Sequence, residues 1–506
     1  MRKKFHLLLY STLIAGPAFG QKAPNIILFL VDDMGWQDTS VPFWTEETPY
    51  NKMYETPHME RLASEGMKFT QAYASSVSSP SRVSLLTGMN AARHKVTNWT
   101  LHKNQSVDAE DKTLSYPAWN VNGLSPFPGI ERTVYATPLP QILKDNGYYT
   151  IHCGKAHFGA IGTPGENPLN LGFDVNIAGH AAGGLGSYLG EKNFGNSTGK
   201  HTPPWGVPGL EKYHGQDIFV TEALTREACS ALDKVKNNGK PFFLYMAHYA
   251  IHIPLDKDNR FYQKYLDKGL PEQEAAYAAL IEGMDKSLGD IMKYLKNNGL
   301  TNNTILLFMS DNGGLAASSR AGDLHVQNFP LNSGKGSAYE GGIREPMIVK
   351  WPGTVNPGSI CDKYIIIEDF FPAILDMAQI HERNTVQHID GKSFVPLLTG
   401  KDDPSENRSL FWNFPNNWGP TGPGIGATCT IRQNDYKLIY YYEDQHFELF
   451  NISNDIGEKN NLAFRHPELV KQLAKDLGEY LKNSGAQRPS LKNTGKEVPW
   501  PDEIVQ

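Results

Sequence analysis

The chain has little cysteine, no surplus of positive charge and, beyond its first residues, no long apolar run. Only 4 of its 506 residues are cysteine, and they lack the paired spacing of a zinc knuckle or a disulfide framework. Lys and Arg number 48 against 54 Asp and Glu, a net charge of -6. The composition therefore does not indicate nucleic acid or an anionic membrane surface as a partner. An anionic ligand would have to be met by a local cluster of positive side chains.

The apolar run that does occur lies at the N-terminus, in "MRKKFHLLLYSTLIAGPAFG". Basic residues come first, an apolar stretch follows, and small residues end it, which is typical of a secretory signal peptide over residues 1–20. The stretch is too short to span a bilayer. We therefore expect a secreted chain with no membrane span, and no lipid anchor because no cysteine lies near the cleavage site.

Continuous apolar runs alternate with amphipathic stretches along residues 21–400. The runs "NIILFLV", "YYTIHCG", "PFFLYMAHYA" and "TILLFMS" are typical of buried parallel strands. Helical patterns cover residues 58–65, 138–145, 220–236 and 272–297. This alternation predicts an α/β domain with a large, mostly parallel sheet flanked by helices.

The character of the chain changes near residue 401. "TCTIRQNDYKLIYYY" and "HFELFNI" are typical of hairpin strands, and residues 467–483 of an amphipathic helix. We therefore expect a smaller C-terminal α+β subdomain over residues 401–506. Within the larger domain, residues 100–137 and 177–215 are rich in turn residues, and we expect them to form loops over the site.

Carboxylates and an amide follow two of the predicted strands. Asp32 and Asp33 follow the first apolar run, and Asp311 and Asn312 follow "TILLFMS". Parallel strands gather ligand groups at their carboxyl ends, and oxygen donors without sulfur favour Ca²⁺ or Mg²⁺ over zinc. Taken singly, each pair could instead be a helix cap or a turn.

A set of ordered motifs narrows these alternatives. "SSPSRVSLLTG" at residues 78–88 resembles, position for position, the signature of the type I sulfatases, which belong to the alkaline phosphatase superfamily. "GKAHFG", "HIP", "SDNGG" and "GKGSAYEGGIREP" follow in the family's order, and "NDIGEKNNLA" resembles its closing signature without the usual proline. Several ordered motifs together are much more specific than any one of them. The resemblance implies an alkaline-phosphatase-like α/β fold and hydrolysis of sulfate esters.

The resemblance also implies that Ser78 is oxidised after translation to Cα-formylglycine (3-oxoalanine). Serine at this position is similar to the serine-type bacterial enzymes, which need a radical sulfatase-maturing enzyme as a partner. A plain serine would form a sulfate ester that is hard to hydrolyse. In the hydrated aldehyde, one hydroxyl attacks sulfur and the other then expels sulfate.

The remaining roles are carried over from the family. One Ca²⁺ ion would be held by Asp32, Asp33, Ser78, Asp311 and Asn312. Lys155 and Lys335 would bind sulfate oxygens, and Arg82 would support residue 78 and the metal carboxylates. His157 would assist breakdown of the covalent intermediate, and His252 would protonate the leaving alcohol.

The secretory signal, the long loops and the aromatic content predict a carbohydrate sulfatase in the periplasm of a Gram-negative bacterium. Galactose or N-acetylgalactosamine sulfated at O4 or O6 is the candidate substrate. The alternatives are a phosphatase or phosphonate hydrolase of the same superfamily, an aryl sulfatase, or a non-catalytic protein that binds sulfated glycans. The side chains that we expect to meet the sugar are Arg93, His94, Asn98, Trp99, His102, His180, His201, Arg320 and His325.

Overall fold

A computed structural model describes residues 23–401 and 406–505. The predicted signal peptide over residues 1–20 lies outside the described residues. Among the helices that the structure does describe, none is long and apolar enough to cross a membrane.

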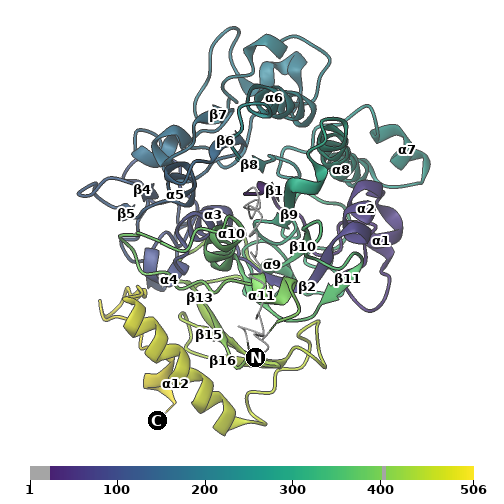
Figure 1. The fold of residues 1–506 in the computed structure, drawn as a ribbon. Coiled ribbons are helices and arrows are strands. Elements are labelled where there is room, and N and C mark those ends of the chain that lie inside the picture. The colour runs from purple at the N-terminus through teal and green to yellow at the C-terminus, as the bar shows by residue number, and fades with distance from the viewer. Residues whose placement is uncertain (1–22, 402–405, 506) are drawn as a thin grey trace, which may run out of the picture.

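A twisted sheet forms the centre of the molecule (Figure 1). Its strands lie in the order β11-β2-β10-β9-β1-β8-β6-β7, and β12 pairs with β2 beside β11. All neighbouring pairs are parallel except those of β10, which runs antiparallel to β2 and β9. The bounds are β1 (Asn25–Val31), β2 (Met67–Tyr73), β6 (Tyr149–Gly154), β7 (Val175–Ile177), β8 (Phe242–Ala247), β9 (Thr304–Ser310), β10 (Arg344–Lys350), β11 (Ser359–Cys361) and β12 (Ile365–Ile366).

Helices cover both faces of this sheet, which explains why its central strands are apolar without alternation. In β1, Ile26, Leu28 and Leu30 pack into one apolar cluster, and the residues between them pack into a second cluster on the other face. The first cluster includes residues of α3 (Ser78–Thr87), α5 (Leu139–Asp145) and α10 (Phe370–Met377). The second includes residues of α2 (Pro57–Glu65), α6 (Val220–Val235) and α8 (Glu272–Asn297).

The C-terminal part forms a separate antiparallel sheet and a long helix, drawn in green to yellow in Figure 1. The sheet has the order β13-β14-β15-β16. Gly485 directly follows α12, and its φ of 67° is the left-handed conformation that favours glycine. The bounds are β13 (Ser409–Phe414), β14 (Thr428–Gln433), β15 (Tyr436–Tyr441), β16 (Phe447–Asn451) and α12 (Pro467–Ser484).

The remaining elements are short. They are α1 (Pro49–Met53), α4 (Ala91–His94), α7 (Tyr262–Asp267), α9 (Glu340–Ile343), α11 (Val395–Leu398), α13 (Pro501–Ile504), β3 (Leu114–Ser115), β4 (Leu124–Ser125), β5 (Val134–Tyr135) and β17 (Ser490–Leu491), with six 3₁₀ turns η1 (Pro164–Glu166), η2 (Pro168–Leu171), η3 (Gly190–Gly195), η4 (Glu211–Tyr213), η5 (Thr301–Asn303) and η6 (Ile367–Asp369) among the described residues.

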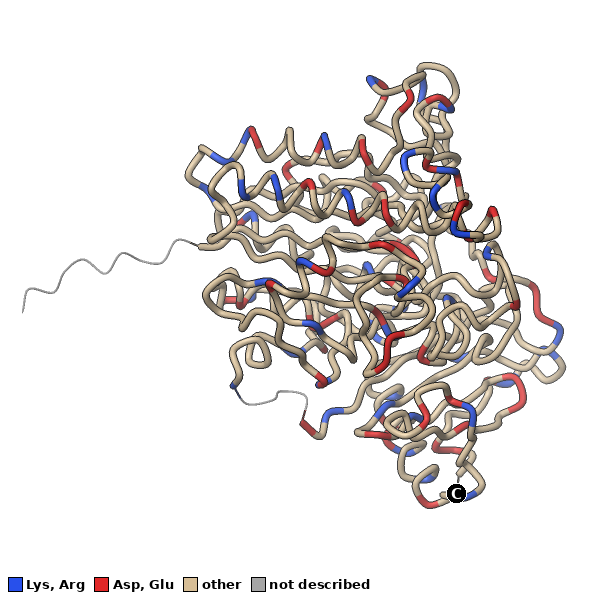
Figure 2. The backbone as a smooth tube through the Cα atoms, turned by 90° about the vertical axis from the view of Figure 1, so that its right-hand side faces the viewer, with Lys and Arg blue, Asp and Glu red and all other residues tan. Residues whose placement is uncertain are grey.

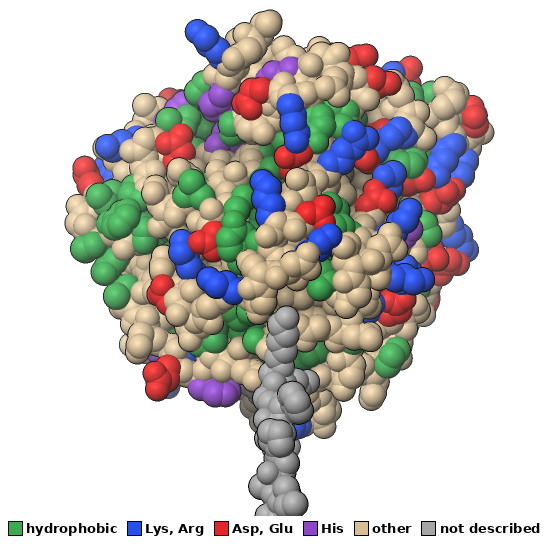
Figure 3. Space-filling view, turned by 45° about the horizontal axis from the view of Figure 1, so that its top comes forward, with side chains coloured by type: hydrophobic (Ala, Val, Ile, Leu, Met, Phe, Trp, Pro, Cys, Tyr) green, Lys and Arg blue, Asp and Glu red, His purple; other side chains and the backbone are tan. Residues whose placement is uncertain are grey.

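The predicted fold class is confirmed: a large, mostly parallel sheet lies between helices, and a smaller α+β unit follows it. The antiparallel strand β10 was not expected from the alternation of runs. Positive and negative positions are interspersed along the backbone (Figure 2) and intermix on the face drawn in Figure 3. This distribution agrees with the balanced charge of the sequence.

Candidate active site

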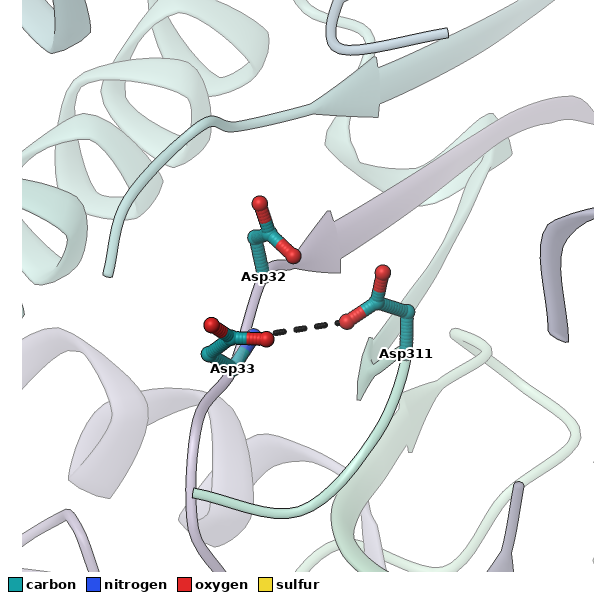
Figure 4. A group of neighbouring side chains, drawn as sticks. All are labelled: Asp32, Asp33 and Asp311. Atoms are coloured by element: carbon teal, nitrogen blue, oxygen red, sulfur yellow. Dashed lines mark hydrogen bonds between the residues drawn. The ribbon is translucent and has the colours of Figure 1, made fainter. Parts of the chain in front are cut away.

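The predicted metal ligands meet at one edge of the central sheet. β1 and β9 are parallel neighbours, and Val31 pairs with Ser310, the last residue of β9. The residues that follow both strands therefore emerge together, and Figure 4 shows the carboxylates of Asp32, Asp33 and Asp311 converging. One oxygen of each lies within 4.8 Å of the others, and all three residues are fully buried.

The backbone at this edge directs two adjacent carboxylates to the same place. The Asp32 N–H donates to the Ala250 carbonyl (2.9 Å), which holds the chain against the segment that follows β8. Asp33 then adopts a φ of 59°, an uncommon conformation for a residue other than glycine. Its N–H donates to Asp311 Oδ1 at 3.3 Å, the contact dashed in Figure 4.

Ser78 is the first residue of α3 and lies directly against this cluster. Its hydroxyl donates to Asn312 Oδ1 at 3.1 Å and lies 3.3 Å from Asp32 Oδ1. The same hydroxyl accepts a hydrogen bond from Lys155 Nζ at 3.0 Å. Arg82, one turn later, donates from Nε to Asp311 Oδ2 at 2.8 Å. The helix thus presents a hydroxyl and a guanidinium to the acidic cluster from one face.

Lysines from two distant segments neutralise the acids. Lys155 Nζ lies 2.7 Å from both oxygens of Asp32, and Lys335 Nζ lies 2.6 Å from Asp33 Oδ1. Burial by itself would raise the pKa of Asp33, but Lys335 and His252 outweigh it and hold the pKa below its usual value. Burial lowers the pKa of Lys155, and Asp32 opposes that shift. With Arg82, three positive groups lie against the three carboxylates.

Two histidines complete the site, each in one defined tautomer because a carbonyl oxygen can only accept. His157 donates from Nε2 to the Thr100 carbonyl (2.9 Å), which leaves its buried Nδ1 as a lone-pair acceptor without a partner. His252 donates from Nδ1 to the Ile253 carbonyl (2.8 Å), and its Nε2 lies 3.8 Å from Asp33 Oδ2. Burial, reinforced by Lys335, lowers the pKa of His252 to about 3.

A cavity of about 300 Å³ opens above these groups. Ser78, His157, His252 and Lys335 lie in its lining. The rest of its wall is mainly apolar and includes three tryptophans from separate segments of the chain, Trp99, Trp205 and Trp418. The reactive groups are therefore reached through a largely aromatic entrance.

The structure brings together every residue predicted for catalysis or metal binding, but it separates most of the residues predicted to meet the sugar. Of these, Trp99 lies in the wall of the cavity. Arg320 is a clear correction: its side chain is fully buried and its guanidinium donates to Glu274 and Asp38. A guanidinium with buried carboxylate partners is a structural cation, so it is not available to a sugar.

Other predicted sugar contacts are likewise engaged elsewhere. His94 is buried against the Ser84 hydroxyl and the Val96 N–H, and burial lowers its pKa to about 3. Arg93 pairs with Asp390 at 2.8 Å. Five further predicted residues do not line the cavity either. Asn98 donates to Asp108, the ring of His180 bonds the Tyr249 hydroxyl and the Pro204 carbonyl, and His201 packs on His180. His325 lies beside Ser333, and His102 is exposed.

Trp205, Trp418 and Ile253 were not predicted, although they line the cavity. Trp205 and Trp418 occur in turn-rich segments, "PPWG" and "NNWGP". A large aromatic residue inside a segment of turn residues is the signal that could have indicated a binding loop.

A large, mostly parallel sheet with an acidic cluster, a helix-borne hydroxyl and two lysines at one edge defines a hydrolase of the alkaline-phosphatase-like superfamily. The sulfatase family profile matches residues 24–380, and the profile "N-sulphoglucosamine sulphohydrolase, C-terminal" matches residues 334–486. The chain belongs to the sulfatase family, and it is a sulfuric ester hydrolase.

Curated relatives and solved structures agree with this assignment. A sulfatase of Formosa agariphila is 29% identical, over 98% of this chain and 96% of its own. Human N-acetylgalactosamine-6-sulfatase is 30% identical, over 91% of this chain and 85% of its own. The crystal structure of Ps i-CgsB, also solved in complex with k-i-k-neocarrahexaose, superposes with a TM-score of 0.71 at 26% identity and covers 96% of this chain and 97% of that one.

Proposed function

We propose that the chain hydrolyses sulfate esters on carbohydrates, using a formylglycine made from Ser78 and one Ca²⁺ ion. The observation that carries the proposal is the position of Ser78: its hydroxyl contacts Asn312, Asp32 and Lys155 at once, at the floor of the cavity. A nucleophile formed there would lie beside both the metal ligands and a cation able to hold a sulfate oxygen.

The donor set fits calcium. Its oxygens come from carboxylates and an amide, with no sulfur, which suits a hard cation. Asp33 Oδ2 is buried and has no hydrogen-bond partner, so it has a coordination position to offer. When bound, the ion would act as a Lewis acid, lowering the pKa of the attacking hydroxyl and polarising a sulfate oxygen. The residues that would hold it are Asp32, Asp33, Asp311, Asn312 and the modified residue 78.

The other side chains of the site would each have a separate role in the reaction. Lys155 and Lys335 would bind sulfate oxygens and offset the charge that develops as the S–O bond breaks. His157 Nδ1, free to accept, would take a proton from the second hydroxyl of residue 78. His252 would act as the general acid through Nε2, which has to take up a proton before it can give one to the leaving alcohol, because Nδ1 holds the one proton of the neutral ring. Arg82 would keep Asp311 ionised and in place.

The carbohydrate substrate is supported by relatives: several are named N-acetylgalactosamine-6-sulfatase, and one solved neighbour holds a neocarrahexaose. We retain galactose or N-acetylgalactosamine sulfated at O4 or O6 as candidates. Maturation would need a radical sulfatase-maturing enzyme, and the predicted signal peptide would take the chain to the periplasm of a Gram-negative cell.

Phosphoryl transfer is the competing chemistry, and a phosphonate monoester hydrolase shares the fold at 17% identity with a TM-score of 0.60. Phosphatases commonly use two metal ions. Within residues 23–401 and 406–505, one group of acids suited to a metal occurs. This argues for the sulfatase reaction over a two-metal phosphatase.

The test is the state and necessity of residue 78. In a host that contains the maturing enzyme, the peptide carrying Ser78 should be lighter by two hydrogen atoms in mass spectrometry, because oxidation removes them. Ser78→Ala should lower turnover of sulfated sugars by at least about a thousandfold while keeping their affinity in isothermal titration.

Ser79→Ala is the matched control, since Ser79 occupies a variable position of the signature. It should keep both the modified peptide and the turnover. An unmodified Ser78 in active enzyme would contradict the formylglycine, and sugar binding without turnover by modified enzyme would favour the non-catalytic alternative.

A further inference from the structure

The cavity above the reactive groups contains very little fixed charge. Among the described residues that line it, Lys335 is the one Lys or Arg, and none is Asp or Glu. Lys335 already faces Asp33 at 2.6 Å. Besides Ser78, the two histidines and Lys335, the polar side chains of the lining are the neutral hydroxyls of Ser318 and Ser319. The wall therefore offers hydrogen bonds but no cation beyond the sulfate-binding floor.

The tryptophans of this wall are held by the backbone around them. A Cβ added to Gly336 would lie 2.1 Å from Trp418 Cε3, so the indole lies directly on the backbone that follows Lys335. The carbonyl of Trp205 accepts the Gly186 N–H at 2.7 Å. The N–H of Trp99 donates to Asn98 Oδ1 at 2.9 Å. The indole of Trp418 is therefore positioned before any ligand arrives, and the backbone that carries Trp205 and Trp99 is held in place.

A pyranose ring matches such a wall. Its C–H groups form an apolar face that an indole can cover, and its hydroxyls can bond to serines. A carboxylate or a second sulfate on the same ring would lose its hydration against aromatic carbon with no cation to replace it. The wall thus selects against additional negative charge as well as for an apolar face.

Resting on the proposed function, we propose that the ring bound in this cavity is a neutral pyranose bearing one sulfate, stacked on Trp205 and Trp418, and that a uronate or a second sulfate on that ring is rejected. Trp418 has a particular place in this scheme because it adjoins Lys335. It can hold the ring where the sulfate reaches the floor of the site.

The experiment compares matched sugars with formylglycine-containing enzyme. The pairs are N-acetylglucosamine 6-sulfate with N-sulfoglucosamine 6-sulfate, and N-acetylgalactosamine 4- or 6-sulfate with its 4,6-disulfate. In each pair that is hydrolysed, kcat/KM for the neutral ring should exceed that for the doubly charged ring by about 100-fold. Higher kcat/KM for the doubly charged ring, or equal values, would overturn the proposal.

Variants test the aromatic wall. Trp205→Ala and Trp418→Ala should each raise KM for the preferred sugar about tenfold with kcat changed less than about threefold, and the Phe variants should recover most of the loss. Phe464→Ala is the control, because Phe464 is 95% exposed and does not line the cavity. An unchanged KM in both Ala variants would remove the tryptophans from the scheme.

Failure of the proposed function would be recognised separately. If no sulfated sugar were turned over, the same pairs would be titrated into Ser78→Ala by calorimetry. Tighter binding of the neutral, monosulfated member would support the selectivity of the cavity without catalysis, and equal or reversed affinities would overturn it.

Discussion

At the scale of single residues, the two active-site histidines differ in the nitrogen that remains free. His157 is anchored through Nε2 and offers Nδ1, whereas His252 is anchored through Nδ1 and offers Nε2. His252 also has the contact with Asp33, and its side chain is 19% exposed in the cavity. Both histidines line the cavity, and His252 is the more exposed of the two, which suits contact with a leaving alcohol.

We expect His252→Ala to lower kcat for a sugar sulfate by about 100-fold to 1000-fold and for 4-nitrophenyl sulfate by less than about tenfold. A sugar alcohol is a poor leaving group and needs the proton, whereas a nitrophenolate leaves without it. Steady-state kinetics on both substrates measures the difference, with the exposed His102→Ala as a control that should change neither. Equal losses on both substrates would exclude His252 as the general acid.

At the scale of elements, helix α2 is capped by a residue of another helix. Its own N-cap, Thr56, makes no side-chain capping bond. Instead Asp285 of α8 accepts the N–H groups of His58 (3.0 Å) and Met59 (2.7 Å). Burial raises the pKa of Asp285 to about 7, although these bonds oppose the shift. The cap therefore links two helices of the same layer.

Asp285→Ala should lower the free energy of unfolding by about 1–3 kcal/mol, because it leaves two helix N–H groups without an acceptor. Denaturant titration measures this loss. Asp290→Ala on the same helix removes an exposed ion pair with Lys286 and should change stability by less than about 1 kcal/mol. Equal effects of the two variants would contradict the capping role.

The contribution of Asp285 to the free energy of unfolding depends on pH with a defined sign. Because the pKa of Asp285 is raised in the folded state, the folded protein binds this proton more tightly than the unfolded chain does. The stabilisation that results is complete below about pH 4 and is lost as pH rises towards 7. The stability of the wild type relative to Asp285→Asn should therefore fall between pH 4 and 7. A difference that is constant across this range would contradict the raised pKa.

At the scale of the whole molecule, a buried ion cluster joins the C-terminal subdomain to the segment that carries Lys335. Lys437 of β15 lies 3.0 Å from Glu340 and 2.5 Å from Glu458. The Glu340 N–H donates to Glu458 at 2.6 Å. Burial raises the pKa of Glu458 to about 7, against the opposing effect of Lys437. Glu340 begins α9, shortly after Lys335 in the sequence.

Lys437→Met should lower the free energy of unfolding by about 3–5 kcal/mol, because it leaves the buried Glu458 without its cation and removes one of the cations that face Glu340, which keeps its ion pair with Arg344. Glu458→Gln should lower it less, since the amide oxygen can still accept from Glu340. Denaturant titration checks both, and Lys475→Met, at an exposed ion pair of α12, is a control expected to change stability by less than about 1 kcal/mol. A loss below about 1 kcal/mol for Lys437→Met would show that the cluster does not join the two parts.

The convergence of the acidic residues could be predicted because each carboxylate follows an apolar strand and because the ordered motifs resemble those of a known family. Asp32 and Asp311 each follow a strand, and β1 and β9 are parallel neighbours, so both carboxylates emerge at one edge. The position of Arg82 beside this cluster could also be predicted, because Arg82 lies one helical turn after Ser78. The alternation of apolar runs with helical patterns likewise predicted the fold class, because the composition of each run indicates whether that segment is buried.

The environment of Arg320 could not be predicted from local sequence patterns. Its place in a loop before Lys335 indicated a sugar contact, but its partners Asp38 and Glu274 come from distant segments. Whether a charged side chain faces solvent or a buried carboxylate depends on that packing, which no local pattern records.

The sequence by itself determined the family, the layered architecture and the types of side chain available for chemistry, because motif spacing, apolar periodicity and strand ends are properties of short segments. Only the tertiary structure decided which tryptophans face the cavity, which nitrogen of each histidine is free and how the C-terminal subdomain meets the segment of Lys335. The physical reason is that burial and charge neutralisation are satisfied by contacts between residues far apart in the chain, and the choice among many such partners is made when the whole core packs.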